Sequence, residues 1–442
     1  MTTATSDVQT EINALLTSSV PTLEETQTTD SSITFTHPGI GMTKAMLDNM
    51  QTHVRAYDEP WASAFVQFSG YGKSQTTPNP LRCTIGDTTA FDIPSGSTGT
   101  TGYYMIRNMA QDADTAYSQF IMWYVTGNET YRINSIGIIR HWMMAESIGD
   151  IYDEQIRVSL AVFKFCLTAD LLRNSTSTTS DYNWTSTDTT NFTSYLNLMK
   201  SKYNRYGHFM NQHSMCAMAY MASAIFRNDS SDYAISIKRA TTNPEAGSSY
   251  DFTDPSNAHN RDGSIISQIR SVTTDVSTGT TVTANIQLVE MGRDQGHAYD
   301  DIGGLSALAM TSYIQGSKVD PTLGTLSTAS DSVNMFNFLD DRLLVGANYL
   351  CKYNLGNSVT YIPCYANQTT TGQIYSAPST SDQGTIDPML GIIYSYYKYI
   401  EGRTDMDTNE ETKYLYQAFT KIYPEGTSQD YLGDSVLFYT LS

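Results

Sequence analysis

The stretch "AYSQFIMWYVTGNETYRINSIGIIRHW" (residues 116–142) decides the fold class, because it predicts two helices in quick succession. Before and after Thr126-Gly127, apolar side chains recur at i, i+3, i+4 and i+7, which places them on one face of an α-helix. A β-strand would instead alternate polar and apolar residues. The stretch therefore predicts a pair of neighbouring helices.

The same spacing recurs along the whole chain and predicts about eleven helices. Besides the quoted pair they cover residues 43–57, 154–173, 192–206, 211–226, 232–241, 303–316, 332–354, 387–402 and 410–423. Polar Ser/Thr/Gly-rich loops separate them, for example at 95–102 and 174–191. Residues 281–292 alternate briefly and predict a short strand or an extended segment. We therefore expect an all-α protein of paired helices.

Composition limits the possible functions. The chain has 442 residues, 40% of them apolar, which is enough for a sizeable core. Its formal net charge is −19 and its Lys and Arg residues do not cluster, so nucleic acid is disfavoured as a partner. No segment reaches the roughly 18 apolar residues that span a bilayer, and the N-terminus lacks the pattern of a signal peptide. We expect a globular protein that does not bind a membrane and whose signal peptide, if any, is already removed.

Several features favour secretion. Only 16% of the residues are charged, Ser and Thr are abundant, and N-x-S/T sequons occur at Asn128, Asn174, Asn183, Asn191, Asn228 and Asn367. Some sequons are expected by chance in such a composition. The five cysteines form no C-x-x-C pair, which argues against a zinc or thioredoxin-like site. Cys351 and Cys364 could form a disulfide or remain buried thiols.

The motif "EMGRDQGHAYDD" (290–301) gathers acids, an arginine, a histidine and a tyrosine in a stretch that two glycines interrupt. A continuous helix would not bring Arg293 and Tyr299 together, because six residues turn about 240° around its axis. We expect a turn at Gly296 and a helix that begins near His297, with Arg293 and Tyr299 in one pocket. The alternative is a surface Arg–Asp pair with the other side chains in the core.

A second polar motif, "YGHFMNQHSMCAMAYM" (206–221), places Asn211, Gln212 and His213 at the start of an apolar helix. One such residue would serve as a helix N-cap. Three in succession exceed what capping needs. We therefore expect them to contribute to a functional site.

These motifs resemble the alginate lyase superfamily, most closely polysaccharide lyase family 38. "FTHPGIGMTKAMLDNMQTHVRAYDEPWASAF" (35–65) looks like its opening, residues 116–142 look like its next helix pair, and "EMGRDQGHAYDDIGGLSALA" resembles its Gly-Arg-Asp-Gln-Gly-His signature. The likeness covers roughly residues 35–400 and weakens in the Ser/Thr-rich insertions and near 387–402. It implies an incomplete α/α toroid of helical hairpins, with a polar segment at 1–30 and one lyase domain at 31–442.

The resemblance also implies β-elimination on an anionic, 4-linked uronic acid polymer. In that reaction the substrate carboxylate must be neutralised before the C5 proton becomes acidic. Arg293 suits this task, and Asn211 and His213 could donate hydrogen bonds to the developing charge. No metal or other cofactor is required, and the histidines lack H-E-x-x-H spacing.

Tyr299 suits the proton transfers, first as base and then as acid, with Arg293 lowering its pKa. His297 would orient or tune Tyr299, and Asp294 would hold Arg293 or cap the following helix. Further substrate contacts are expected from Gln212, Gln295, Tyr206, Trp142, Tyr394 and Tyr397.

Two other classes remain open. A glycoside hydrolase could use Glu290 with Asp300 or Asp301 if their carboxyl groups lie roughly 5 to 9.5 Å apart. A carbohydrate-binding protein would bind polymer without cleaving it. For the lyase, a single tyrosine requires syn elimination, so we expect mannuronate-rich alginate to be cleaved first, glucuronan second and guluronate poorly.

Overall fold

The computed structural model describes residues 2–366, 372–428 and 430–441. Its contacts group into two compact units. The first unit comprises residues 1–204, 219–232 and 436–442, and the second comprises 205–218 and 233–435. The predicted boundaries at 1–30 and 31–442 stay a prediction.

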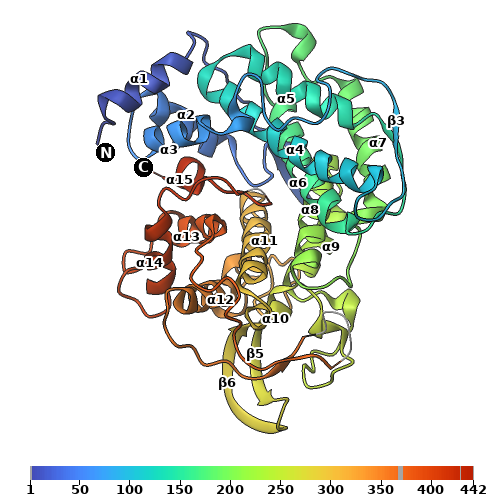
Figure 1. Ribbon diagram of the computed structural model, residues 1–442, viewed down its shortest axis with the longest axis vertical. Helices are drawn as coiled ribbons and strands as arrows, with labels where there is room; N and C mark the ends of the chain where they lie inside the picture. Colours follow the sequence, from blue (N-terminus) through green and yellow to red (C-terminus); the bar gives the residue numbers. More distant parts are fainter. Residues whose placement is uncertain (1, 367–371, 429, 442) are drawn as a thin grey trace. The chain divides into compact units, whose positions relative to one another are not determined.

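Helices dominate the first unit. They are α1 (Ser6–Leu15), α2 (Lys44–Arg55), α3 (Trp61–Ser69), α4 (Thr101–Thr126), α5 (Glu129–Trp142), α6 (Glu154–Arg173) and α7 (Ser186–Tyr203). Helix α4 packs along both α5 and α6, and α6 packs on α7 (Figure 1).

The α4–α5 hairpin has a clear local cause. Gly127 ends α4 with φ 74°, a left-handed conformation that glycine adopts without a Cβ penalty, and its N–H donates to Trp123 O. Asn128 then caps α5, because its side chain accepts the Thr130 N–H. The helical hairpin predicted from residues 116–142 is therefore confirmed.

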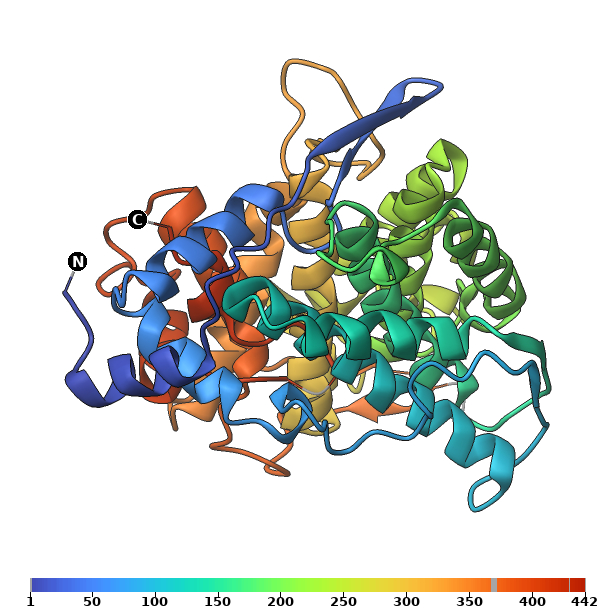
Figure 2. The same cartoon turned by 90° about the horizontal axis from the view of Figure 1, so that it is seen from above.

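Two small sheets complete the first unit. Strands β1 (Thr26–Asp30) and β2 (Ile33–His37) form an antiparallel hairpin that projects as a narrow ribbon (Figure 2). Strands β3 (Phe91–Ile93) and β4 (Ala145–Ile148) pair in parallel.

The second unit contains α10 (Ile265–Gln268), α11 (Gln295–Ile314), α12 (Phe338–Asn354), α13 (Gly391–Ser395) and α14 (Lys413–Ile422). Helices α8 (Asn211–Arg227), α9 (Ser230–Thr241) and α15 (Ser435–Tyr439) cross the division between the units. Strands β5 (Ile269–Asp275) and β6 (Thr280–Leu288) form a long antiparallel hairpin, and β7 (Cys364–Tyr365) pairs with β8 (Ile374–Tyr375). Helix α11 packs on α12 and α13 (Figure 1).

Helix α11 is the core helix of the second unit, and it is buried along almost its whole length. Two glycines allow this close packing. A Cβ at Gly303 would lie 2.7 Å from Met389 Sδ, and one at Gly304 would lie 2.7 Å from Ser214 Oγ. The start of α8 therefore lies directly against α11.

The prediction of an all-α chain built from helical hairpins is confirmed, and the strand expected at 281–292 is β6. The spacing of apolar residues did not predict α1, α3 or the first part of α4. Helix α4 begins at Thr101, within the polar loop expected at 95–102. Cys351 and Cys364 are free thiols, so the disulfide alternative is wrong.

The sequons differ in their surroundings. The Asn174 amide is buried and donates to Asp170 O, which argues against a glycan at that sequon. The sequon at Asn367 lies outside the described residues. Within the part of the chain that the structure describes, no helix is both long and apolar enough to cross a bilayer.

Candidate functional site

The start of α11 arranges the first polar motif. The Asp294 side chain caps the helix, because its Oδ1 accepts the His297 N–H at 2.8 Å. Helix α11 begins at Gln295, two residues before the expected start near His297, so Gly296 lies in the first turn of the helix rather than in a preceding turn. The capping role expected for Asp294 is confirmed.

Arg293 lies just before this cap. Its Nη1 donates to Glu290 Oε1 at 3.0 Å, and its Nε lies 3.5 Å from Asp294 Oδ2. The guanidinium lies 5.5 Å from the centre of the Phe209 ring. The Arg293 side chain is 19% exposed, so a ligand can still reach it.

Two buried carboxyl groups, those of Glu290 and Asp301, lie close to Arg293. Glu290 and Asp301 are both fully buried neighbours. Burial raises the pKa of Glu290, although the positive charge of Arg293 opposes this shift. Burial and the charge of Glu290 raise the pKa of Asp301 well above its ordinary value. The pair therefore holds a proton more readily than free carboxyl groups do.

A hydrogen bond joins the two polar motifs. Asn211 Nδ2, at the start of α8, donates to Asp300 Oδ2 at 3.0 Å, although the residues are 89 positions apart. Burial raises the pKa of Asp300 well above its ordinary value. Asn211 Oδ1 is buried and has no hydrogen-bond partner among the described residues. This contact brings the two motifs together, and their part in a functional site stays a prediction.

His213 is fully buried in the first turn of α8. Its Nδ1 lies 2.9 Å from the Gly263 N–H, which can only donate, so Nδ1 must be the acceptor. Burial lowers the pKa of His213 to about 4, so the ring is neutral near pH 7 and carries its hydrogen on Nε2. In the described part of the chain this Nε2–H has no partner. His213 thus offers a buried donor.

Tyr299 lies on α11 and is only 1% exposed. Its hydroxyl is without a hydrogen-bond partner among the residues described. Burial, followed by the nearby Cys351 and Asp387, raises the pKa of Tyr299 well above its ordinary value. The expectation that Arg293 lowers this pKa is therefore wrong, because desolvation dominates. In the free protein Tyr299 is a neutral phenol.

His297 does not orient Tyr299 in the expected way. Its Nδ1 lies 2.8 Å from Asp294 Oδ1 and 2.7 Å from Oδ2, whereas the Tyr299 hydroxyl has no partner among the residues that the structure describes. The His297 side chain is 36% exposed. It is therefore placed at the surface of the motif, beside the helix cap.

Several predicted substrate contacts have structural roles instead. Gln295 is buried and donates to Met291 O and Ser379 O, so it holds the loop that follows β8. Tyr397 is buried and donates to Phe336 O at 3.0 Å. Tyr394 stacks on Phe419 in the core, with ring centres 4.1 Å apart. These positions do not support contacts with a polymer.

The remaining predicted contacts differ from one another. Trp142 belongs to the first unit, is buried, and donates from Nε1 to Asp112 Oδ2. Tyr206 is 49% exposed, as a residue that contacts a polymer should be. Gln212 is half-buried beside Asn211. Tyr206 and Gln212 stay candidate substrate contacts.

Two polar residues at this place were missed. The Tyr431 hydroxyl is buried and has no hydrogen-bond partner among the described residues. Burial raises the pKa of Tyr431 well above its ordinary value, and the negative charge of Asp300 is the next largest cause. Gln268 is buried, and neither of its amide atoms has a hydrogen-bond partner in the described part of the chain. It lies close to Gly263, which donates to His213. Neither residue stands in a recognisable motif, so no sequence pattern could have indicated them.

Comparison with known proteins adds a distant likeness. No protein-family model matches the chain, and no curated protein matches it. Among solved structures, alginate lyase A1-III from Sphingomonas species A1 is similar over 89% of this chain and 95% of its own, at 10% identity and a TM-score of 0.45. A variant of that enzyme complexed with a tetrasaccharide covers 90% of this chain and 94% of its own, at 11% identity and a TM-score of 0.44. At these values the function has to be argued from the residues themselves.

Proposed function

We propose that the protein is a polysaccharide lyase that cleaves a 4-linked uronic acid polymer by β-elimination. The hydrogen bond between Asn211 and Asp300 carries this proposal, because it joins the polar starts of α8 and α11. Those two helix starts supply three buried polar atoms that have no partner among the described residues, namely Asn211 Oδ1, His213 Nε2 and the Tyr299 hydroxyl oxygen. Buried polar atoms are normally satisfied, so this concentration favours a site that is completed by a ligand.

The first chemical task is to stabilise charge on the substrate carboxylate. Removal of the C5 proton moves negative charge onto that group, and donors fixed in a water-poor site stabilise it strongly. Arg293 offers a partly exposed guanidinium, and His213 offers a neutral Nε2–H. Asn211 Oδ1 can accept a hydrogen bond from a sugar hydroxyl. These groups bind and polarise the uronate.

The second task is proton transfer, for which we assign Tyr299. As a phenolate it takes the C5 proton, the C5–H electrons form the C4=C5 double bond, and the C4–O4 bond breaks. The resulting phenol returns the proton to the departing O4, so atoms and charges balance. Because burial raises the pKa of Tyr299, the phenolate is scarce at neutral pH. Turnover should therefore rise with pH.

The hydrolase alternative finds less support. Glu290 and Asp301 are buried neighbours with raised pKa values, rather than two carboxyl groups placed on either side of an accessible sugar bond. Asp300 is tied to Asn211. The arrangement of Glu290 and Asp301 suits two carboxyl groups that share a proton inside the protein.

We propose mannuronate-rich alginate as the preferred substrate and glucuronan as the second, with an extracellular location. A single tyrosine reaches only one face of the sugar, which suits the syn arrangement in mannuronate and glucuronate. Guluronate presents the two reacting groups on opposite faces. The test compares initial rates of unsaturated-uronate absorbance on polymannuronate, glucuronan and polyguluronate. A preference for polyguluronate would contradict the single-tyrosine mechanism.

A further inference from the structure

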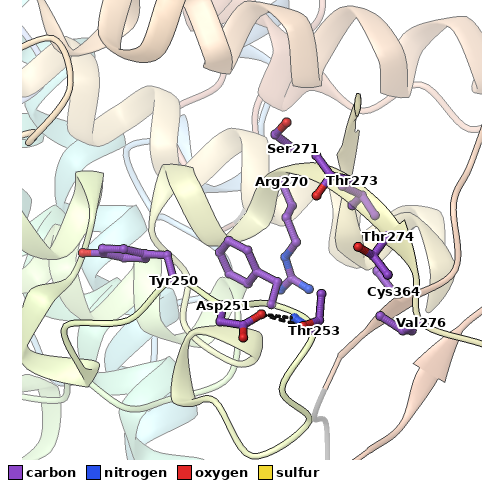
Figure 3. Close-up of a pocket in the computed structure, with 11 residues that line it drawn as sticks. Tyr250, Asp251, Thr253, Arg270, Ser271, Thr273, Thr274, Val276 and Cys364 are labelled. Carbon is purple, nitrogen blue, oxygen red and sulfur yellow. Dashed lines mark hydrogen bonds between the residues drawn. The ribbon is translucent and has the colours of Figure 1, made fainter. Parts of the chain in front are cut away.

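A cavity in the second unit, outside the proposed lyase site, contains a buried cation. It has a volume of about 140 Å³ and lies between the loop at 250–253 and strand β5 (Figure 3). Arg270 of β5 extends its guanidinium into this space, next to the Phe252 ring at 4.1 Å. Arg270 itself is fully buried.

Only part of this guanidinium is satisfied. Arg270 Nη1 donates to Asn260 Oδ1 at 3.0 Å and to Tyr365 O at 2.7 Å. Its Nε and Nη2 are buried and have no hydrogen-bond partner in the described part of the chain. Those two nitrogens form one edge of the guanidinium, the edge that binds two oxygens of a single oxyanion side by side.

The positive charge of Arg270 has no close counterion in the described part of the chain, because no salt bridge there reaches it. The Asp262 carboxylate is used by His259 Nδ1 at 2.5 Å and by Ser267 Oγ at 3.0 Å. The Asp251 carboxylate accepts from Thr253 N and Oγ1. Since an unpaired buried charge is costly, burial lowers the pKa of Arg270, and an anion would relieve that cost.

The cavity has the size and surroundings for such an anion. Its volume is several times the roughly 30 Å³ that one water molecule occupies in the liquid. Thr253, Ser271 and Thr273 line it and are exposed, so solutes can enter from the surface.

We propose that this cavity binds an oxyanion with two adjacent acceptor oxygens, held side by side by Arg270 Nε and Nη2. A carboxylate, a sulfate and a phosphate share this chemistry. The source could be a free inorganic anion or the carboxylate of a uronic acid. The site does not depend on lyase activity.

The test is isothermal titration of the whole protein with sulfate, phosphate, acetate and glucuronic acid, with ionic strength held constant by sodium chloride. We expect saturable binding of at least one of them and at least a ten-fold loss of affinity in Arg270→Met. The pattern of responses separates inorganic anions from a uronate. Equal affinity in wild type and Arg270→Met, or no saturable binding of any probe, would overturn the proposal.

Two rim variants keep the test decisive if Arg270→Met does not fold. Asp251→Asn removes a negative charge at the rim and should tighten binding by about two-fold, because exposed charges interact weakly across water. Ser271→Glu adds a negative charge at the opposite side and should weaken binding. Unchanged affinity in both variants would show that the anion binds elsewhere.

Discussion

Acid should weaken the fold through His213 by an amount that the structure defines. Its pKa is lowered to about 4 in the folded protein by burial, against about 6.5 for an unfolded histidine. Below pH 6.5 the unfolded chain binds the proton and the folded chain resists it. The contribution of His213 to the free energy of unfolding is therefore fully present above pH 6.5 and is lost as the pH falls towards 4. The loss amounts to roughly 3 kcal/mol.

Other groups respond in the opposite direction and must be separated from this effect. The raised pKa values of Glu290, Asp300 and Asp301 mean that acid relieves their buried charge. His213→Asn isolates the histidine, because the amide oxygen can still accept the Gly263 N–H but does not titrate. The carboxyl groups are the same in both proteins.

The assay is urea unfolding of wild type and His213→Asn, followed by circular dichroism between pH 4 and pH 7.5. The variant has a fixed cost from lost packing, so only the change with pH matters. We expect wild type to lose roughly 3 kcal/mol more than the variant over this range. A stability difference that stays constant with pH would show that His213 is not a buried neutral ring and would refute the tautomer argument.

The remaining predictions concern turnover and the buried carboxyl pair. Tyr299→Phe should lower kcat by about 10²- to 10⁴-fold with little change in polymer affinity measured by calorimetry, and substantial residual turnover would remove Tyr299 from the mechanism. In wild type, kcat/KM should rise about ten-fold per pH unit between pH 7 and 9, because the base is a phenol of raised pKa; a flat profile would point to another base. Arg293→Ala should reduce kcat by about 10²- to 10³-fold, whereas an increase in KM alone would reduce Arg293 to a binding residue. Asp301→Asn should raise the melting temperature at pH 7 but not near pH 4, since Asp301 ionises only at a cost in the folded state; equal gains at both pH values would contradict its raised pKa.

The parts of the fold that follow local rules could be predicted from the sequence. The α4–α5 hairpin follows from apolar spacing on either side of Gly127, and the cap at Asp294 follows from its place before an apolar helix. Helix α1 was missed because it is polar on most of its surface and buries only Ile12. A weak apolar pattern carries little information about where a helix forms.

The site could be predicted only in part, because desolvation depends on the whole fold. The two motifs and their meeting were foreseeable, but the sequence cannot indicate that Tyr299 is 1% exposed and so has a raised pKa. No sequence pattern indicated Tyr431, because it is connected to the site only by its position near Asp300 in the folded protein. Tyr397 was assigned to a sugar groove from its type alone, whereas its hydroxyl is satisfied in the core.

The most direct test of the proposed lyase is the product formed from polymannuronate. Wild type, Tyr299→Phe and a matched control, Tyr104→Phe, would be incubated with the polymer, and both unsaturated-uronate absorbance and reducing ends would be measured. Tyr104 is an exposed residue of helix α4 with no part in the proposed site, so its variant should keep turnover. We predict that wild type and Tyr104→Phe produce the two signals in equal amounts and that Tyr299→Phe produces neither. New reducing ends without ultraviolet absorbance would show hydrolysis and contradict the central claim.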